Sequence, residues 1–102
     1  MAEQRKHHRV PISFQVTCVQ DDANSFEGVV QDVSFGGLFI ETDRSLAFGT
    51  KLIIVAKGLA ARELRLPAIV RWAEPHGLGV QFDLLGAYAT HVIVDLVKKH
   101  SS

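Results

Sequence analysis

Residues 64–82 read LRLPAIVRWAEPHGLGVQF, two alternating apolar runs joined by a short turn-forming segment. The apolar positions of the first run share one parity: Leu64, Leu66, Ala68, Val70 and Trp72. Alternation over this length predicts a long β-strand with one face in a core, so Trp72 is expected on the core side. Residues 74–77 supply the turn, and the second run alternates through Phe82. Pro67 lies inside the first strand and predicts an edge position or a bulge there.

The chain before this hairpin repeats the same pattern in shorter pieces. A first strand is expected over residues 12–19, opened by Pro11, with inward positions at Ile12, Phe14, Val16 and Cys18. Further strands are expected over about 26–31, 38–42 and 51–56, separated by turn-rich segments such as 21–25. Short strands with turn signals every 8 to 12 residues or so predict a small antiparallel barrel or sandwich.

After the last strand the apolar period changes from two residues to that of a helix. The residues at helical spacing are Leu85, Tyr88, Ala89, Val92 and Leu96, and polar residues mark the opposite face. Asp83 is the predicted N-cap of a helix over about 84–99. This helix is expected to pack its apolar stripe across the barrel or across an opening in it.

Length and charge set the class of protein. The 102 residues suit one domain, divided here into a flexible basic tail over 1–10 and a folded unit over 11–100. Eleven basic and eleven acidic side chains give no net charge, which argues against a partner of duplex nucleic acid. The single cysteine, Cys18, predicts a buried, inert thiol in a reducing compartment. No long apolar run or signal region is found, so a cytoplasmic location without membrane insertion is expected.

Two short motifs stand apart from the strand pattern: Arg5-Lys6-His7-His8-Arg9 and Asp32-Val33-Ser34-Phe35-Gly36-Gly37. In this order, ahead of a β-rich body, they resemble the PilZ domain, a bacterial receptor module for the second messenger cyclic di-GMP. Val70-Arg71-Trp72, followed by Gly79-Val80-Gln81-Phe82, also resembles the late strand pair of that family. The resemblance implies an all-β dominated fold, a six-stranded antiparallel β-barrel with one C-terminal α-helix.

The resemblance also implies a ligand site. Arg5 and Arg9 would clasp phosphate and guanine, because the planar guanidinium bonds a phosphate, or the O6 and N7 edge of guanine, through two hydrogen bonds. Asp32 and Ser34 would lie beneath the ligand, since a carboxylate accepts the N1–H and N2–H donors of guanine and a hydroxyl donates or accepts. Gly37 removes a side chain where backbone must approach closely or take a positive φ.

Three further residues have weaker assignments at this site. Lys6 would add positive charge, and Gly36 would help the backbone to reverse direction beside Gly37. Trp72 would stack on a guanine if it lay at the rim of the barrel, although its parity favours the core.

Metal binding and catalysis are not expected. The five histidines, at positions 7, 8, 76, 91 and 100, lack the spacing of a zinc site, and the lone cysteine is far from them. The sequence contains no nucleophile elbow, Walker loop or HExxH motif. We therefore expect no enzyme activity and no cofactor, with cyclic di-GMP as the ligand.

The function expected from these features is a single-domain receptor whose tail closes on cyclic di-GMP. It would signal through an unidentified effector protein in motility, attachment or exopolysaccharide control. One alternative is a ligand-independent adaptor that docks its partner on the barrel or on strand 52–56. Another is a small barrel that binds single-stranded nucleic acid, which the zero net charge and the mostly core-parity aromatic residues disfavour. Affinity, stoichiometry and oligomeric state are left open.

Overall fold

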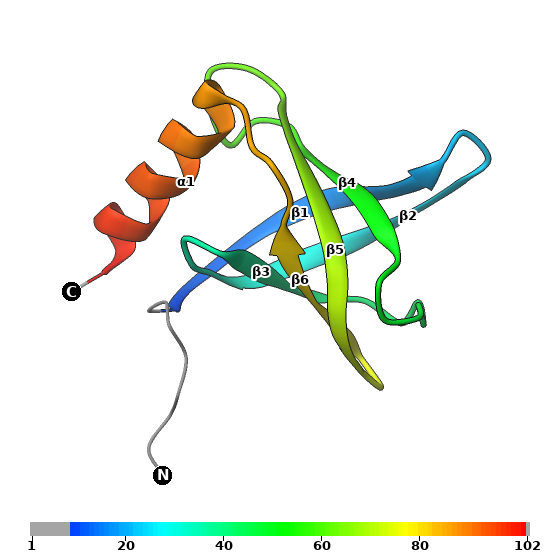
Figure 1. The fold of residues 1–102 in the computed structure, drawn as a ribbon. Coiled ribbons are helices and arrows are strands. Elements are labelled where there is room, and N and C mark those ends of the chain that lie inside the picture. The colour runs from blue at the N-terminus through cyan, green and yellow to red at the C-terminus, as the bar shows by residue number, and fades with distance from the viewer. Residues whose placement is uncertain (1–8, 102) are drawn as a thin grey trace, which may run out of the picture.

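Six antiparallel strands close into a barrel in the computed structural model, which describes residues 9–101 (Figure 1). The strands are β1 (Val10–Asp21), β2 (Asn24–Val33), β3 (Gly37–Glu41), β4 (Lys51–Ala56), β5 (Leu64–Glu74) and β6 (Gly77–Phe82). Their order around the barrel is β1-β2-β3-β6-β5-β4, and β1 pairs with β4 to close it. One helix, α1 (Ala87–His100), follows β6. The predicted fold, a six-stranded antiparallel barrel with a C-terminal helix, is confirmed.

The barrel interior is filled by aliphatic side chains from every strand. The largest of these with almost no exposure are Leu38, Ile40, Ile54, Leu64, Leu66 and Leu78. Alternate positions along each strand supply them, because successive side chains of a strand point to opposite faces. Val10, which the sequence assigns to the tail, is the first residue of β1 and is fully buried.

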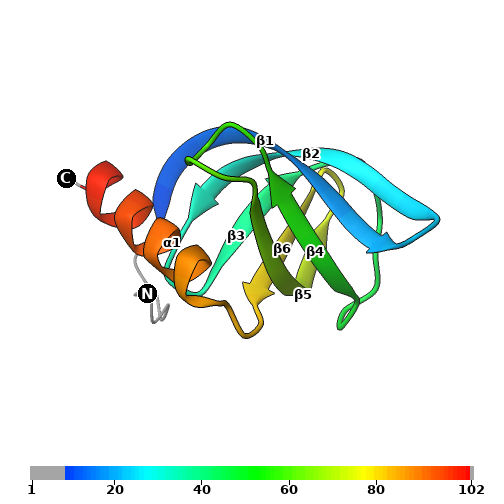
Figure 2. The same ribbon diagram turned by 90° about the horizontal axis from the view of Figure 1, so that it is seen from above.

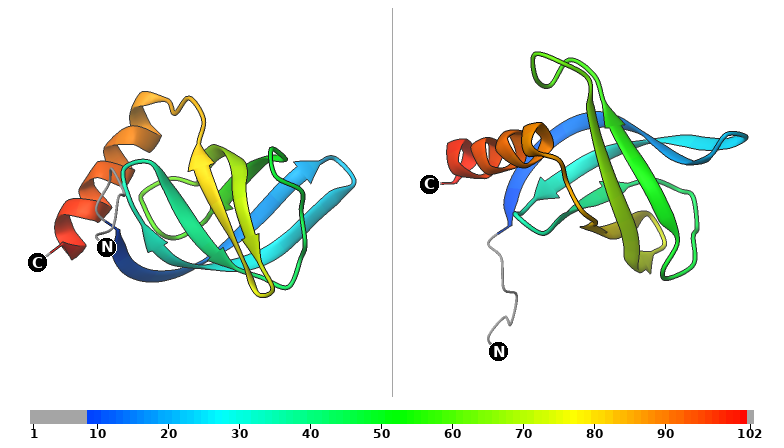
Figure 3. Two further views of the ribbon diagram at one scale, coloured as in Figure 1. Left: turned by 60° about the horizontal axis from the view of Figure 1, so that its bottom comes forward. Right: turned by 45° about the horizontal axis from the view of Figure 1, so that its top comes forward.

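Helix α1 lies across the end of the barrel where β1 begins, opposite the β1–β2 turn (Figures 2 and 3). Its apolar face packs against β1, β2 and β5 through Ala89, Val92, Ile93, Leu96 and Val97. No helix in the described part of the chain is long and apolar enough to cross a membrane.

The predicted start of this helix was wrong. Gly86 is the N-cap, and the helix begins at Ala87 rather than directly after Asp83. The Asp83 N–H donates to the Pro67 carbonyl oxygen at 2.8 Å, which keeps this residue at the sheet, and its carboxylate accepts from the Leu84 N–H at 2.9 Å.

Two expectations about strands are modified by the pairing. Pro67 pairs with Ile53 in regular register, and the β6 ladder ends next to it, at Ala68 and Phe82, so proline stands at a local edge. The bulge of β5 lies further along, between Val70 and Trp72.

Strand β4 is flanked by β1 and β5, and its apolar side chains, apart from half-buried Ile53, are buried. It offers no apolar docking face of the kind considered for an adaptor.

Candidate functional site

Arg9 and Asp32 form an ion pair where β1 begins and β2 ends. The Arg9 Nε donates to Asp32 Oδ1 at 2.8 Å, and Nη2 lies 2.6 Å from the same oxygen. Nη2 is buried, yet no described residue offers it an aligned hydrogen-bond acceptor. Nη2 is therefore paired with the Asp32 carboxylate by charge but without an aligned hydrogen bond.

Ser34 holds the turn that links β2 to β3. Its hydroxyl oxygen accepts from the N–H groups of Gly36 and Gly37, each at 3.2 Å, and its own N–H donates to the Gly37 carbonyl at 2.9 Å. The residue is 1% exposed. The Phe82 N–H donates to the Gly36 carbonyl at 2.8 Å, which ties this turn to β6. The Ser34 side chain therefore shapes the loop, and its hydrogen-bonding capacity is largely used there.

Gly37 is required by a close approach between strands. A Cβ at this position would overlap the carbonyl oxygen of Val80 on β6. Among the described residues only Gly49 and Gly58 have a positive φ. Of the two reasons considered for glycine at position 37, close packing of the backbone is the one that applies.

Trp72 lies on the outer face of the barrel, where the prediction had favoured the core. Val70 pairs with Val80 and Trp72 pairs with Gly79, which leaves Arg71 as the extra residue of a bulge. The bulge shifts the alternation by one position, because two residues of β5 oppose one residue of β6. The parity that pointed Trp72 inward thus ends at Val70, and Trp72 is 42% exposed.

The Trp72 indole lies flat over the sheet. A Cβ on Gly79 would overlap the indole, so glycine leaves the space that the ring occupies. The ring stacks beside Phe39 with centroids 6.4 Å apart and planes inclined by 21°, and the Arg9 guanidinium carbon lies 5.7 Å from the ring centre. The indole is packed against β6 on one side and remains partly open to a ligand.

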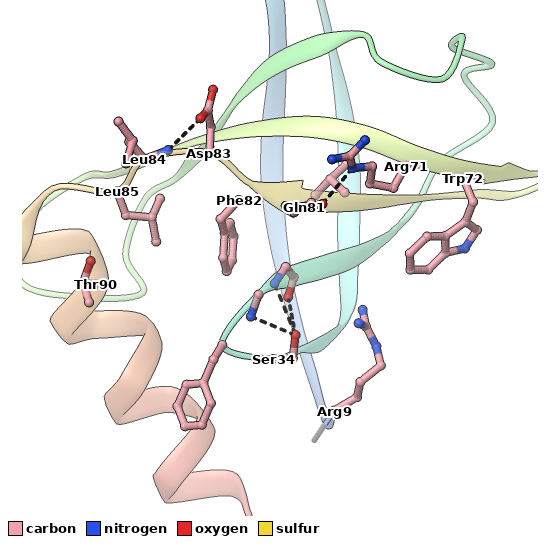
Figure 4. Close-up of a pocket in the computed structure, with 14 residues that line it drawn as sticks. Arg9, Ser34, Arg71, Trp72, Gln81, Phe82, Asp83, Leu84, Leu85 and Thr90 are labelled. Atoms are coloured by element: carbon pink, nitrogen blue, oxygen red, sulfur yellow. Dashed lines mark hydrogen bonds between the residues drawn. The ribbon is translucent and has the colours of Figure 1, made fainter. Parts of the chain in front are cut away.

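A pocket of about 650 Å³ brings these groups together (Figure 4). Five of the predicted site residues line it: Arg9, Ser34, Gly36, Gly37 and Trp72. Asp32 lines a neighbouring hollow of about 320 Å³ that shares Arg9 and Trp72. Arg5 and Lys6 lie outside the described residues. In Figure 4 the Arg9 side chain extends toward the Trp72 indole, and the turn at Ser34 lies between Arg9 and β6.

Part of the pocket lining comes from residues that the sequence did not indicate. The additional residues are Phe35, Arg71, Val80, Gln81, Phe82, Asp83, Leu84, Leu85 and Thr90. The sequence could have indicated Arg71, because this residue alternates with the core-facing positions of the strand and directly precedes Trp72. The residues near α1 had none, because their approach to the turn at Ser34 depends on where the helix docks.

The aromatic residues are also more exposed than their parity suggested. Phe26, at 9% exposure, is the only buried aromatic side chain in the described part of the chain, which contains all eight. Phe35, Phe48 and Trp72 are exposed by 44%, 70% and 42%. Two of these three, Phe35 and Trp72, line the pocket.

The site thus combines a cation, a carboxylate and a flat aromatic ring on a rigid sheet. An arginine suits an anion or the acceptor edge of a base, and a partly open indole suits stacking. Within residues 9–101 no group of three or more His, Cys, Asp or Glu side chains is arranged to hold a metal ion.

Comparisons with known proteins agree with the fold. The family model described as PilZ domain matches residues 3–99. The PilZ domain of CeSA from a cellulose-synthesizing bacterium superimposes with a TM-score of 0.75 at 24% identity, over 90% of this chain and 96% of that one. The PilZ domain of YcgR from Escherichia coli, solved with c-di-GMP, has a TM-score of 0.77 at 12% identity, over 96% and 92%.

A third similar structure is longer than this chain. The inhibitor of motility MotI/DgrA from Bacillus subtilis has a TM-score of 0.77 at 15% identity, and the match covers 96% of this chain but 51% of that one. A comparison with curated proteins found no match. Because the family match extends over nearly the whole sequence and these structures share its fold, the chain belongs to the PilZ domain family.

Proposed function

We propose that this chain is a receptor for cyclic di-GMP that binds the nucleotide in the pocket between Arg9, the turn at Ser34 and Trp72. The observation that carries the proposal is the Arg9 guanidinium, which lines the pocket, is held by the Asp32 carboxylate and lies 5.7 Å from the centre of a partly open indole. Cyclic di-GMP offers phosphate oxygens and guanine O6 and N7 as acceptors, together with two bases that can stack. The family match and the YcgR structure with c-di-GMP support this choice of ligand.

Each predicted site residue takes a role in this proposal. Arg9 donates to phosphate or to guanine, while Asp32 accepts from guanine N–H groups through Oδ2, because both contacts from Arg9 use Oδ1. Trp72 stacks on a base. Ser34, with Gly36 and Gly37, maintains the turn beneath the ligand rather than donating to it, since the serine is almost fully buried.

Two further steps of the proposed mechanism are closure of the segment before the barrel on the ligand and binding of an effector protein. Arg5 and Lys6 would close over the ligand and add charge, and the ordering of this segment would cost part of the binding free energy. The closed form would present a new surface to an effector protein, so that ligand and effector strengthen each other's binding. A receptor of this kind needs no enzyme activity, and a cytoplasmic location stays a prediction.

Isothermal titration calorimetry with cyclic di-GMP tests the proposal. Wild type is expected to show saturable binding, and Arg9→Ala is expected to lose roughly tenfold to a hundredfold in affinity, the value of charge-assisted hydrogen bonds. The same titration yields the stoichiometry. Arg44→Ala is the matched control, because it also removes one arginine packed on an aromatic ring, Phe26, but lies outside both hollows of the site.

Two results would count against the receptor. If wild type binds no cyclic di-GMP, the PilZ fold serves as a ligand-independent adaptor and its protein partner becomes the target. If Arg9→Ala and Arg44→Ala lose affinity equally, binding depends on total charge and the site lies elsewhere.

A further inference from the structure

The bulge in β5 places two successive side chains, Arg71 and Trp72, on the outer face of the barrel. In a regular strand they would point to opposite faces. Here Arg71 is the unpaired residue between the Val70–Val80 and Trp72–Gly79 pairs, and both side chains are exposed and line the same pocket. A cation and a partly open aromatic ring therefore come from neighbouring positions of β5 to one pocket; in Figure 4 the Arg71 side chain extends toward Gln81 and the Trp72 indole extends away from it.

Contacts with β6 and with the β3–β4 connection orient the Arg71 guanidinium. Its Nε donates to Gln81 Oε1 at 2.7 Å, and its central carbon lies 5.5 Å from the centre of the Phe48 ring. No carboxylate among the described residues forms an ion pair with Arg71, and its two Nη groups have no hydrogen-bond acceptor there. The guanidinium is thus positioned through one edge while its outer edge and its charge remain available.

Gln81 extends this row of donors toward the turn. Its Oε1 accepts from Arg71, so its amide NH₂ points away as a second donor. Gln81 also pairs with Gly37 across the β3–β6 ladder, which places it next to the glycine that closes the Ser34 turn. The wall from Trp72 to Gly37 therefore presents hydrogen-bond donors along β5 and β6.

We infer that Arg71, positioned by Gln81, reads the O6 and N7 edge of a guanine that stacks on Trp72 and thereby selects guanine over adenine. The inference rests on the proposed cyclic di-GMP site and adds a specificity-determining residue to it. The fork of an arginine matches the two acceptors of guanine, whereas adenine presents the N6 amino group, a donor, in place of O6. A guanine that stacks on the Trp72 ring brings its O6 and N7 edge to Arg71, rather than the phosphates of cyclic di-GMP.

Discrimination between cyclic di-GMP and cyclic di-AMP tests this inference. Affinities for both nucleotides are measured by calorimetry and by competition for wild type, Arg71→Ala, Arg71→Lys and Arg65→Ala. Arg65→Ala is the matched control, because it removes an exposed arginine from the same strand outside the pocket. Arg71→Ala is expected to lose roughly tenfold to a hundredfold in affinity for cyclic di-GMP and much less for cyclic di-AMP. Arg71→Lys keeps the charge but not the fork, so its discrimination is expected to fall similarly.

The outcomes separate this inference from the proposed function. Absence of cyclic di-GMP binding by wild type overturns both. Binding by wild type with an unchanged guanine preference in Arg71→Ala overturns the inference alone. Equal losses for the two nucleotides, or full recovery in Arg71→Lys, would show that Arg71 acts only as a charge and would also overturn it. Circular dichroism of each variant confirms that the barrel is folded.

Discussion

The regular stretch of the β1–β2 ladder and the neighbourhood of Arg9 follow different rules. Residues 14–19 of β1 pair with residues 25–30 of β2 without interruption. Around the pocket, the register shifts in three ladders: between Pro11 and Phe14, between Val30 and Asp32, and between Val70 and Trp72. Asp32 and Trp72 each directly follow a shift, and Arg9 precedes the first.

This difference shows how the barrel separates stability from binding. In the regular stretch, alternation alone decides which side chains are buried. At a bulge one residue is added, so neighbouring side chains are re-aimed toward the outside. The candidate site is built where the alternation fails, and the core is built where it holds.

The largest expected effect comes from the core. Leu66→Ala removes a fully buried side chain, which should lower the free energy of unfolding by about 2–5 kcal/mol. Because Leu66 does not line the pocket, the folded protein should keep its affinity for cyclic di-GMP. Urea denaturation followed by circular dichroism measures the first quantity and calorimetry the second. A variant of near wild-type stability would mean that the core is not the source of stability argued here.

Two glycines on the outer face, Gly37 and Gly79, are expected to differ in what a substitution costs. Gly37→Ala places a Cβ against the Val80 backbone, which should lower the free energy of unfolding by about 1–3 kcal/mol. Gly79→Ala meets the Trp72 side chain instead, which can move, so stability should fall by less while ligand affinity falls through the displaced ring. Urea denaturation and calorimetry of the pair distinguish the effects. Equal losses of stability would contradict the distinction between a backbone contact and a side-chain contact.

The smallest expected effect concerns the thiol of the regular stretch. Burial, followed by the nearby negative charge of Glu27, raises the pKa of Cys18 from 9.0 to about 12. The folded state therefore holds the thiol protonated while the unfolded chain ionises it near pH 9. Its stabilising effect is complete below that pH and is lost as the pH rises toward 12. The loss should be on the order of 1 kcal/mol near pH 10.

Cys18→Ala provides the control for this pH dependence. Its free energy of unfolding should fall less steeply between about pH 9 and pH 11 than that of wild type. A thiol reagent should also label the folded protein slowly at neutral pH. Parallel pH profiles, or rapid labelling without unfolding, would show that Cys18 is not held in the protonated, buried state.

Sequence alone determined the elements that depend on local pattern. The alternation at Leu64, Leu66 and Ala68 predicted the core face of β5, and the change of period near residue 83 predicted a helix, because strand and helix periods follow from backbone geometry. The two motifs also assigned Arg9 and Asp32 to one ligand site, which stays a prediction. The structure adds that the two side chains form an ion pair.

Tertiary structure alone decided where the alternation breaks and what closes the pocket. The bulge at Arg71 depends on how β5 pairs with β6, which no local pattern specifies, and it moved Trp72 from the expected core to the outer face. The start of α1 likewise depends on the hydrogen bond from Asp83 to Pro67, a residue sixteen positions away. Burial patterns follow from the covalent order of residues, whereas a binding surface depends on long-range pairing that only the folded barrel establishes.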